Sequence, residues 1–259
     1  WITASEIEAW TSREPRRAQE LLPELVWRLL LASCVNMTEH HFPHSKAVQY
    51  SGYDGYLDTD TRSVFFPCGK SVWEFGTDQK NLSKFNSDYK KRSENPNGIE
   101  QFSTTFCFVS SRIWNHQTGI VEITAQKRAD NIWKDVRIID ASNLEMWLEA
   151  CPAVSAWLSG IMGSDINGLL SLEDYWINMT EHTVPKLNVE FFICSREPIV
   201  PQITNIFNAG SKQIILSAES EIEAILVLAA ELVSSSDPIY MELLERCIIV
   251  QSPSMWDVV

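Results

Sequence analysis

Residues 67–77 read Pro-Cys-Gly-Lys-Ser-Val-Trp-Glu-Phe-Gly-Thr, and this stretch decides how the first half of the chain is interpreted. Within it, Val72–Phe75 is apolar except for one carboxylate, Glu74, and Gly76 closes the run. Short runs rich in Val and aromatic residues that end at Gly or Pro are typical of β-strands. The stretch therefore predicts a buried strand that carries one acidic side chain near its end.

Upstream of this strand, residues 3–33 have a helical pattern. Thr3 can cap a short first helix, and leucines then recur at helical spacing from Leu21 to Leu30. Because a proline inside a helix removes a hydrogen bond, Pro23 places the start of the main helix near Leu22.

Around the quoted strand, short β-type runs give way to a helix and then to further strands. The β-type runs before the helix are 47–57, 63–66 and 71–75, and the histidines at 40, 41 and 44 fall in a loop that precedes them. A helical pattern follows over 78–92, then strands over 104–109 and 136–139 and a helix over 143–158. In order, this αβββαβ pattern with a further strand and helix predicts an α/β fold, a single sheet with helices on both faces.

We place a domain boundary in the segment Gly160–Gly168, dividing residues 1–162 from residues 163–259. The second part alternates strands with helices over about 197–208 and 219–234, the strands being 187–194, 213–218 and 246–251. This βαβαβ order predicts a small parallel sheet. The run 214–220 stands where a nucleotide-binding domain carries its phosphate loop, but it contains neither Gly nor Lys, so we interpret the domain as a degenerate or truncated nucleotide-binding domain.

Composition and charge limit the possible functions. The chain is 45% hydrophobic and 21% charged, its six cysteines have no metal-ligand spacing, and no apolar run approaches the roughly 18 residues of a membrane span. We expect a cytoplasmic protein without membrane contact, and a segment of a longer chain, since it opens with Trp1. A net charge of −13 means that DNA binding would require a local basic patch or a partner.

Two carboxylates are candidates for a metal site. Asp54 lies between two glycines at a strand end, where the backbone can approach a phosphate or an ion closely. Glu74 is isolated in an apolar strand, where a carboxylate is costly unless it is paired or binds a metal. From the residues alone, a turn role for Asp54 and a solvent-facing Glu74 remain the alternative.

Several separated blocks, in order, resemble a PD-(D/E)xK (restriction-endonuclease-like) nuclease domain that occurs at the N-terminus of large bacterial multidomain proteins, several of them linked to anti-phage defence. The likeness covers about residues 1–160. The blocks are Leu-Leu-Pro-Glu-Leu-Val at 21–26, Gly-Tyr-Asp-Gly at 52–55, residues 67–77, Lys84, Asp-Tyr-Lys-Lys-Arg at 88–92, Phe-Val-Ser-Ser-Arg at 108–112 with Trp114, and residues 140–148.

The resemblance implies a restriction-endonuclease-like core in which Asp54 and Glu74 hold Mg²⁺ or Mn²⁺. The family motif has a lysine two residues after the second acid, where this chain has Gly76. Lys84 on the following helix is our candidate for the displaced catalytic lysine, and Glu24 on the first long helix is a candidate outer-shell acid. Near this acidic pair, four cations could contact the DNA backbone: Lys80, Lys90, Lys91 and Arg92.

We therefore expect a Mg-dependent deoxyribonuclease that cuts DNA as the effector domain of a larger, oligomeric bacterial defence protein with further domains or protein partners. The alternative is an inactive module of the same fold that docks a partner or senses a nucleic acid. Gly76 and the charge of −13 favour this alternative. An NTPase would need a phosphate loop, which the sequence lacks.

Overall fold

The computed structural model describes residues 1–42, 52–164, 168–209 and 213–256. The chain forms two compact units, Trp1–Cys151 and Pro152–Val259. The division falls before the expected boundary between residues 162 and 163, because helix α6 (Pro152–Met162) packs against strand β6 (Leu169–Ser171) of the second unit. In the described residues, no helix has the length and apolar character to cross a membrane.

Two helices open the first unit. Thr3 caps α1 (Ala4–Arg13) as predicted, in a reciprocal capping box with Glu6. The second helix, α2 (Pro15–Ser33), begins at Pro15, so the predicted start near residue 22 is wrong and Pro23 lies inside the helix. The apolar face of α2 is buried, and this burial outweighs the hydrogen bond that Pro23 loses.

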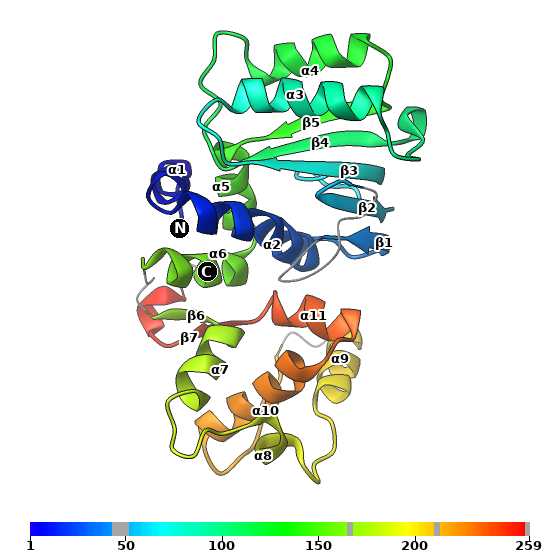
Figure 1. Cartoon of the computed structure of the whole chain (residues 1–259). Coiled ribbons are helices and arrows are strands. Elements are labelled where there is room, and N and C mark those ends of the chain that lie inside the picture. Colours follow the sequence, from blue (N-terminus) through cyan, green and yellow to red (C-terminus); the bar gives the residue numbers. More distant parts are fainter. Residues whose placement is uncertain (43–51, 165–167, 210–212, 257–259) are drawn as a thin grey trace. The chain divides into compact units, whose positions relative to one another are not determined.

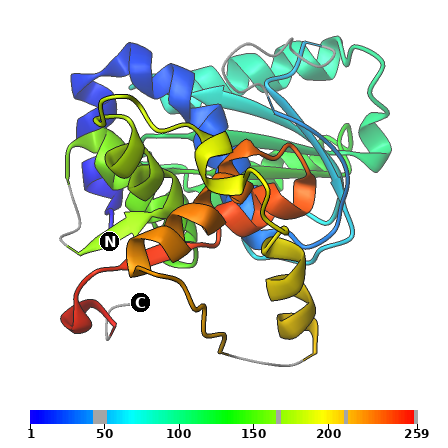
Figure 2. The ribbon, with the colours of Figure 1, turned by 90° about the horizontal axis from the view of Figure 1, so that it is seen from below.

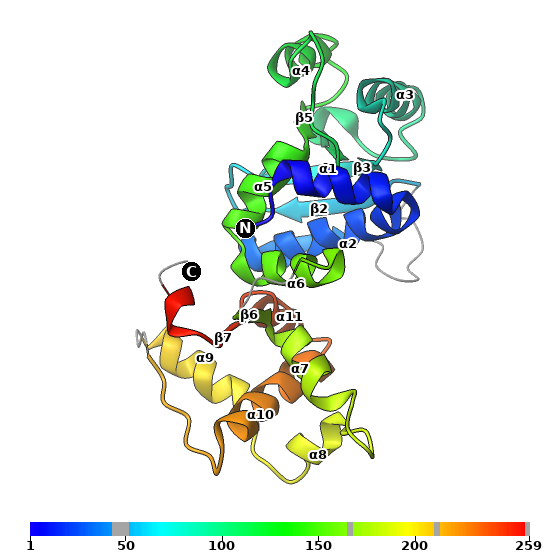
Figure 3. The same ribbon diagram turned by 90° about the vertical axis from the view of Figure 1, so that its left-hand side faces the viewer.

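The sheet of the first unit has the order β1-β2-β3-β4-β5. Its first three strands are antiparallel neighbours, and β4 and β5 continue the sheet in parallel with β3. The strands are β1 (Met37–His41), β2 (Gly55–Thr59), β3 (Gly69–Gly76), β4 (Thr105–Ser110) and β5 (Asp135–Ile139). The predicted α/β class, with helices on both faces of one sheet, is confirmed (Figures 1 and 3).

Alternation along the strands decides which residues face which helices. Helices α3 (Asn81–Glu94) and α4 (Ile120–Ala129) cover one face, while α1, α2 and α5 (Ala141–Glu149) cover the other (Figure 1). Val72 packs in the core beneath α3 with Phe85 and Tyr89. Because side chains alternate along a strand, Glu74 shares the face of Val72 and points toward α3.

Several local predictions in the first unit are corrected. Residues 63–66 form no strand, and 64–66 are bends, because Phe65 and Phe66 turn to pack on Trp147. The Phe65 and Trp147 ring centroids lie 5.6 Å apart. His40 and His41, expected in a loop, lie in β1. His44 and residues 47–51 of the first predicted β run lie outside the described residues.

Two helix predictions also differ from the structure. The helix predicted over 143–158 is two helices, because the chain breaks before Pro152, which opens α6. Helix α4 was not predicted at all, because its apolar residues do not gather on one side: Ile123 is buried but Val121 is exposed.

An aromatic cluster fastens α3 to the sheet. Phe85 is fully buried, and its ring centroid lies 5.6 Å from that of Phe108 and 5.9 Å from that of Tyr89. Tyr89 in turn meets Phe106 edge to face. Burial of these large rings is the main contribution to the position of α3 over β3 and β4.

The second unit is mainly helical. Its core gathers Trp176, Phe192 and the small and branched residues of α10 (Glu221–Ser234), which Figure 2 shows in orange. The other elements are α7 (Leu172–Thr180), α8 (Val189–Ile193), α9 (Val200–Asn208), α11 (Pro238–Leu244), β7 (Ile248–Val250) and the 3₁₀ turn η2 (Pro253–Met255).

The predicted parallel βαβαβ sheet of the second unit is wrong. The run 187–194 contains helix α8, capped by the Asn188 side chain, because a short apolar run has no periodicity that separates a strand from a helix. Residues 213–218 form no strand, and β7 pairs antiparallel with β6. The helices expected over 197–208 and 219–234 are confirmed as α9 and α10.

We expect Phe85→Ala to lower the free energy of unfolding by about 3–5 kcal/mol, because it leaves a cavity in the aromatic cluster under α3. The matched control is Phe102→Ala, since Phe102 is 78% exposed, and it should change stability by less than about 0.5 kcal/mol. Urea unfolding followed by circular dichroism measures both. Equal effects would contradict the assigned position of α3.

Candidate metal centre

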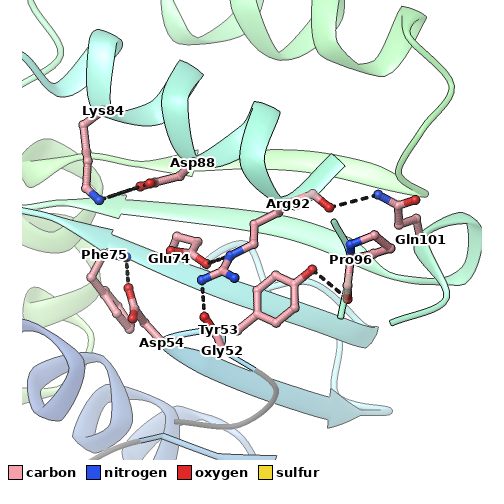
Figure 4. A network of polar contacts seen from close by, with 10 residues as sticks. All are labelled: Gly52, Tyr53, Asp54, Glu74, Phe75, Lys84, Asp88, Arg92, Pro96 and Gln101. Carbon is pink, nitrogen blue, oxygen red and sulfur yellow. Dashed lines mark hydrogen bonds and ion pairs between the residues drawn. The ribbon is translucent and has the colours of Figure 1, made fainter. Parts of the chain in front are cut away.

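A polar cavity of about 310 Å³ lies where β3 ends against α3. It contains the two acids and the lysine that the sequence pattern singled out, Asp54, Glu74 and Lys84 (Figure 4). The residues that line it are Gln19, Gly52, Asp54, Glu74, Phe75, Gly76, Thr77, Asp78, Lys84, Asp88, Lys91 and Arg92.

Asp54 is fixed by the backbone of β3. Its N–H donates to the Trp73 carbonyl (3.0 Å), and its Oδ2 accepts from the Phe75 N–H (3.1 Å). The preceding Gly52 has a φ of +80°, and a Cβ at that position would lie 2.9 Å from Asn97 Nδ2, so the turn requires glycine. One carboxylate oxygen of Asp54 is thus held, while Oδ1 accepts no hydrogen bond from the described part of the chain.

Glu74 is held from the opposite side by α3. Its Oε1 accepts from the Nε of Arg92, and both side chains are buried, 5% and 6% exposed. Its second oxygen, Oε2, has no hydrogen-bond donor among the described residues. Glu74 therefore repeats the arrangement of Asp54, in which the protein orients one oxygen of the carboxylate and leaves the other available to a ligand.

Helix α3 presents three charges of alternating sign to this acidic pair. Lys84, Asp88 and Arg92 are four residues apart, so they form one stripe along the helix. Lys84 donates to Asp88 Oδ1 (3.1 Å), and its Nζ lies 3.0 Å from Oδ2, which accepts no hydrogen bond. Figure 4 shows all three side chains reaching from α3 toward β3 and the turn at Asp54.

Gly76 makes room for Lys84. A Cβ at position 76 would lie 3.2 Å from Lys84 Cγ and 2.9 Å from the buried ring of Phe108. The stem of Lys84 therefore occupies the space beside the strand that a side chain at 76 would need. Gly76 and the lysine on α3 are therefore two parts of one packing arrangement.

Burial shifts the pKa of both acids upward. For Asp54, burial raises the pKa, and the Phe75 N–H with the charges of Lys84 and Arg92 offsets only part of that effect. For Glu74, burial and then the charge of Asp54 outweigh Arg92 and raise the pKa to about 7. Burial alone would lower the pKa of Lys84, but Asp88 and the two acids raise it, so Lys84 carries a proton at neutral pH.

The remaining predicted site residues lie in three kinds of place: on the surface, in the core beside Glu74, and away from the cavity. Lys80, Lys90 and Lys91 are exposed on or next to α3, as residues that contact a DNA backbone must be. Arg92, expected with them, is instead buried against Glu74, because α3 turns its eighth residue after Lys84 toward the sheet. Glu24 does not line the cavity and pairs with Arg28 at 3.1 Å.

Sequence reasoning missed three features of the site. The first two are Asp88 and the inward position of Arg92. Both residues follow Lys84 at four-residue spacing, which places them on the same side of a helix, but the prediction treated α3 only as a basic surface helix. Gln19, rather than Glu24, is the α2 residue that lines the cavity. No sequence signal distinguishes Gln19, because the helix was predicted to start near Leu22, after this residue.

The residues fit a divalent cation that takes few protein ligands. Within the described ranges, no three His, Cys, Asp or Glu residues group as a metal-enclosing set. Seven charged residues line the cavity: the acids are Asp54, Glu74, Asp78 and Asp88, and the bases are Lys84, Lys91 and Arg92. With every group ionised they leave one negative charge uncompensated, which a cation would balance. Mg²⁺ accepts one or two carboxylates and keeps its waters, so the pair suits it.

No protein-family model, characterised protein or solved structure matches this chain. The assignment of the site therefore depends on its geometry and on the sequence pattern.

The raised pKa of Glu74 predicts a specific pH dependence of stability. The folded state keeps a proton on Glu74 up to about pH 7, whereas the unfolded chain releases it near pH 4.5. The folded state binds more protons in this window, so the Glu74 contribution falls as pH rises from about 4.5 to 7, by about 1–3 kcal/mol.

In Glu74→Gln this falling contribution should be absent, so its unfolding free energy should decline less steeply between pH 5 and 7.5 than that of the parent. Denaturant unfolding at several pH values measures it, and Glu94→Gln, an exposed acid on α3, controls for loss of charge. Parallel curves for the parent and Glu74→Gln would contradict the assignment.

Proposed function

We propose that the first unit is a divalent-metal-dependent nuclease that hydrolyses phosphodiester bonds in DNA. The observation that carries this proposal is that Asp54, Glu74 and Lys84, which lie far apart in sequence, line one polar cavity. The space that Gly76 leaves for the Lys84 stem supports the displaced lysine. The resemblance of its sequence to PD-(D/E)xK nuclease domains suggests that the unit is the effector domain of a larger defence protein.

The chain's own groups divide the chemistry between them. Asp54 Oδ1 and Glu74 Oε2 would hold Mg²⁺ or Mn²⁺. When bound, the cation supplies a Lewis acid and a water of lowered pKa. Lys84, kept protonated by Asp88, can donate a hydrogen bond to a phosphate oxygen and stabilise the negative charge that grows there during hydrolysis.

The distribution of charge supports a nucleic-acid substrate for this unit. The residues of the second unit include 4 Lys and Arg against 14 Asp and Glu, whereas the first unit has 17 against 20. The net charge of −13 is therefore concentrated in the second unit, at −10. On or next to α3, Lys80, Lys90 and Lys91 are exposed, and we assign them as contacts to a phosphate backbone.

One observation favours the alternative of an inactive module with the same fold. Glu74 is already paired with Arg92, and Lys84 with Asp88, so four of the charged residues that line the cavity neutralise one another in pairs. A module that only docks a partner would keep these pairs and would not bind Mg²⁺ or Mn²⁺. Metal titration separates the two functions.

We expect the purified chain to nick supercoiled DNA with Mg²⁺ or Mn²⁺. Asp54→Asn and Lys84→Met should each lower the rate of nicking by about 100-fold or more, because the loss of one contact to the transition state has an effect of that size. Agarose gel electrophoresis follows the reaction. The matched control is Lys70→Met, an exposed lysine near the start of β3, which should cut as the parent does.

Cleavage by Asp54→Asn at the parent rate would refute the assigned site. A parent chain that neither cuts DNA nor binds Mn²⁺ would establish the inactive alternative.

Substituting Lys80, Lys90 and Lys91 together by Gln should weaken DNA binding without abolishing metal binding. Each phosphate contact contributes about 0.9 to the slope of log affinity against log salt, so the slope should become shallower by about 2–3. Fluorescence anisotropy at several salt concentrations measures it, with Lys70→Gln as the control. An unchanged slope would place the DNA surface elsewhere.

A further inference from the structure

Arg92 connects three separate parts of the site. Its Nε donates to Glu74 on β3, its Nη2 donates to the carbonyl of Gly52, and its guanidinium carbon lies 4.5 Å from the centroid of the Tyr53 ring. Gly52 and Tyr53 directly precede Asp54. One buried side chain on α3 thus touches the strand that carries one acid and the turn that carries the other (Figure 4).

The surroundings hold Arg92 in this position. The C-terminal carbonyl of α3 at Arg92 accepts from Gln101 Nε2 (3.2 Å), and the Tyr53 hydroxyl donates to the Pro96 carbonyl (3.2 Å). Tyr53 is fully buried, so the ring under the guanidinium is also fixed. A planar guanidinium can bond a carboxylate and a carbonyl in a set geometry, which a lysine ammonium cannot do.

We infer that Arg92 is a positioning residue: it aligns Glu74 and the turn of Asp54 so that their free oxygens, Oε2 and Oδ1, bind a divalent cation together. This inference depends on the proposed function, because it assigns Arg92 a part in the same metal site. Arg92 uses only Oε1 of Glu74, so it supports a metal ligand rather than occupying its place.

The structure offers a matched control for this arginine. Arg128 on α4 also donates from Nε to a carboxylate, that of Asp135, and from Nη2 to a backbone carbonyl, that of Val136. It lies outside the cavity. Arg128→Lys therefore removes the same kind of fork without changing the acidic pair.

The test is a titration of the whole chain with Mn²⁺ alone, followed by electron paramagnetic resonance of the free ion. Arg92→Lys should bind Mn²⁺ about 10–100-fold more weakly than the parent, as loss of an outer-shell partner does elsewhere. Arg128→Lys should bind as the parent does. Because Lys retains the charge, a weakened Arg92→Lys points to geometry rather than to charge balance.

A second measurement requires no folded variant. In the parent labelled with ¹⁵N-arginine, the Arg92 Nε–H should remain protected from exchange when Mg²⁺ saturates the site. Arg92→Lys binding Mn²⁺ as tightly as the parent, or loss of that Nε–H signal on adding Mg²⁺, would overturn the inference. A parent that binds no Mn²⁺ would instead overturn the proposed function itself, and the inference with it.

Discussion

A carboxylate on a buried strand needs a counter-charge, and the side of the first unit that contains α3 and the candidate site is arranged around that requirement at Glu74. The residues on either side of Glu74 in the strand are apolar and its side chain is only 5% exposed, so water solvates the acid poorly, and Arg92 reaches it from the facing helix. Together with the packing of the aromatic rings beneath α3, this contact sets the rotation of the helix about its own axis. Once Arg92 faces β3, the four-residue spacing brings Asp88 and Lys84 to the same side, and the aromatic rings of Phe85 and Tyr89 can pack beneath.

The fold of the first unit was predictable where one local pattern carried the information. The apolar run that ends at Gly76 predicted β3, and two further apolar runs predicted β4 and β5. The signal is clearest for β4, which is buried on both faces and has the composition of such strands. The predictions failed where tertiary contacts overrode local preference. Pro23 is accommodated inside α2, and Phe65 and Phe66 pack on Trp147 instead of pairing in a ladder.

The sequence singled out Asp54, Glu74 and Lys84, which line one cavity, but it did not indicate Asp88 or Gln19 or the way in which these side chains pair. Asp54 stood out between two glycines at a strand end and Glu74 as an isolated acid in an apolar strand, and the resemblance, with Gly76 where its motif has lysine, directed attention to Lys84. The four-residue spacing places Arg92 on the same side of α3 as Lys84, but its pairing with Glu74 also depends on the angle of α3 over the sheet. The second unit was less predictable, since its apolar runs are short and 213–218 has β-forming residues without a neighbouring strand.

The glycine at 76 has a consequence for how the site can change over evolution. A lysine on the strand itself would be placed by covalent geometry, whereas Lys84 is placed by the packing of an entire helix. Any shift of α3 relative to the sheet would therefore displace the charges of Lys84, Asp88 and Arg92 together. A slip of α3 by one turn, about 5.4 Å, would bring an acid to the place of the lysine and reverse the sign of the charge beside Gly76. Substitutions in the aromatic cluster between α3 and the sheet are thus constrained by the placement of these three charges, although Phe85, Tyr89 and Phe108 do not line the cavity.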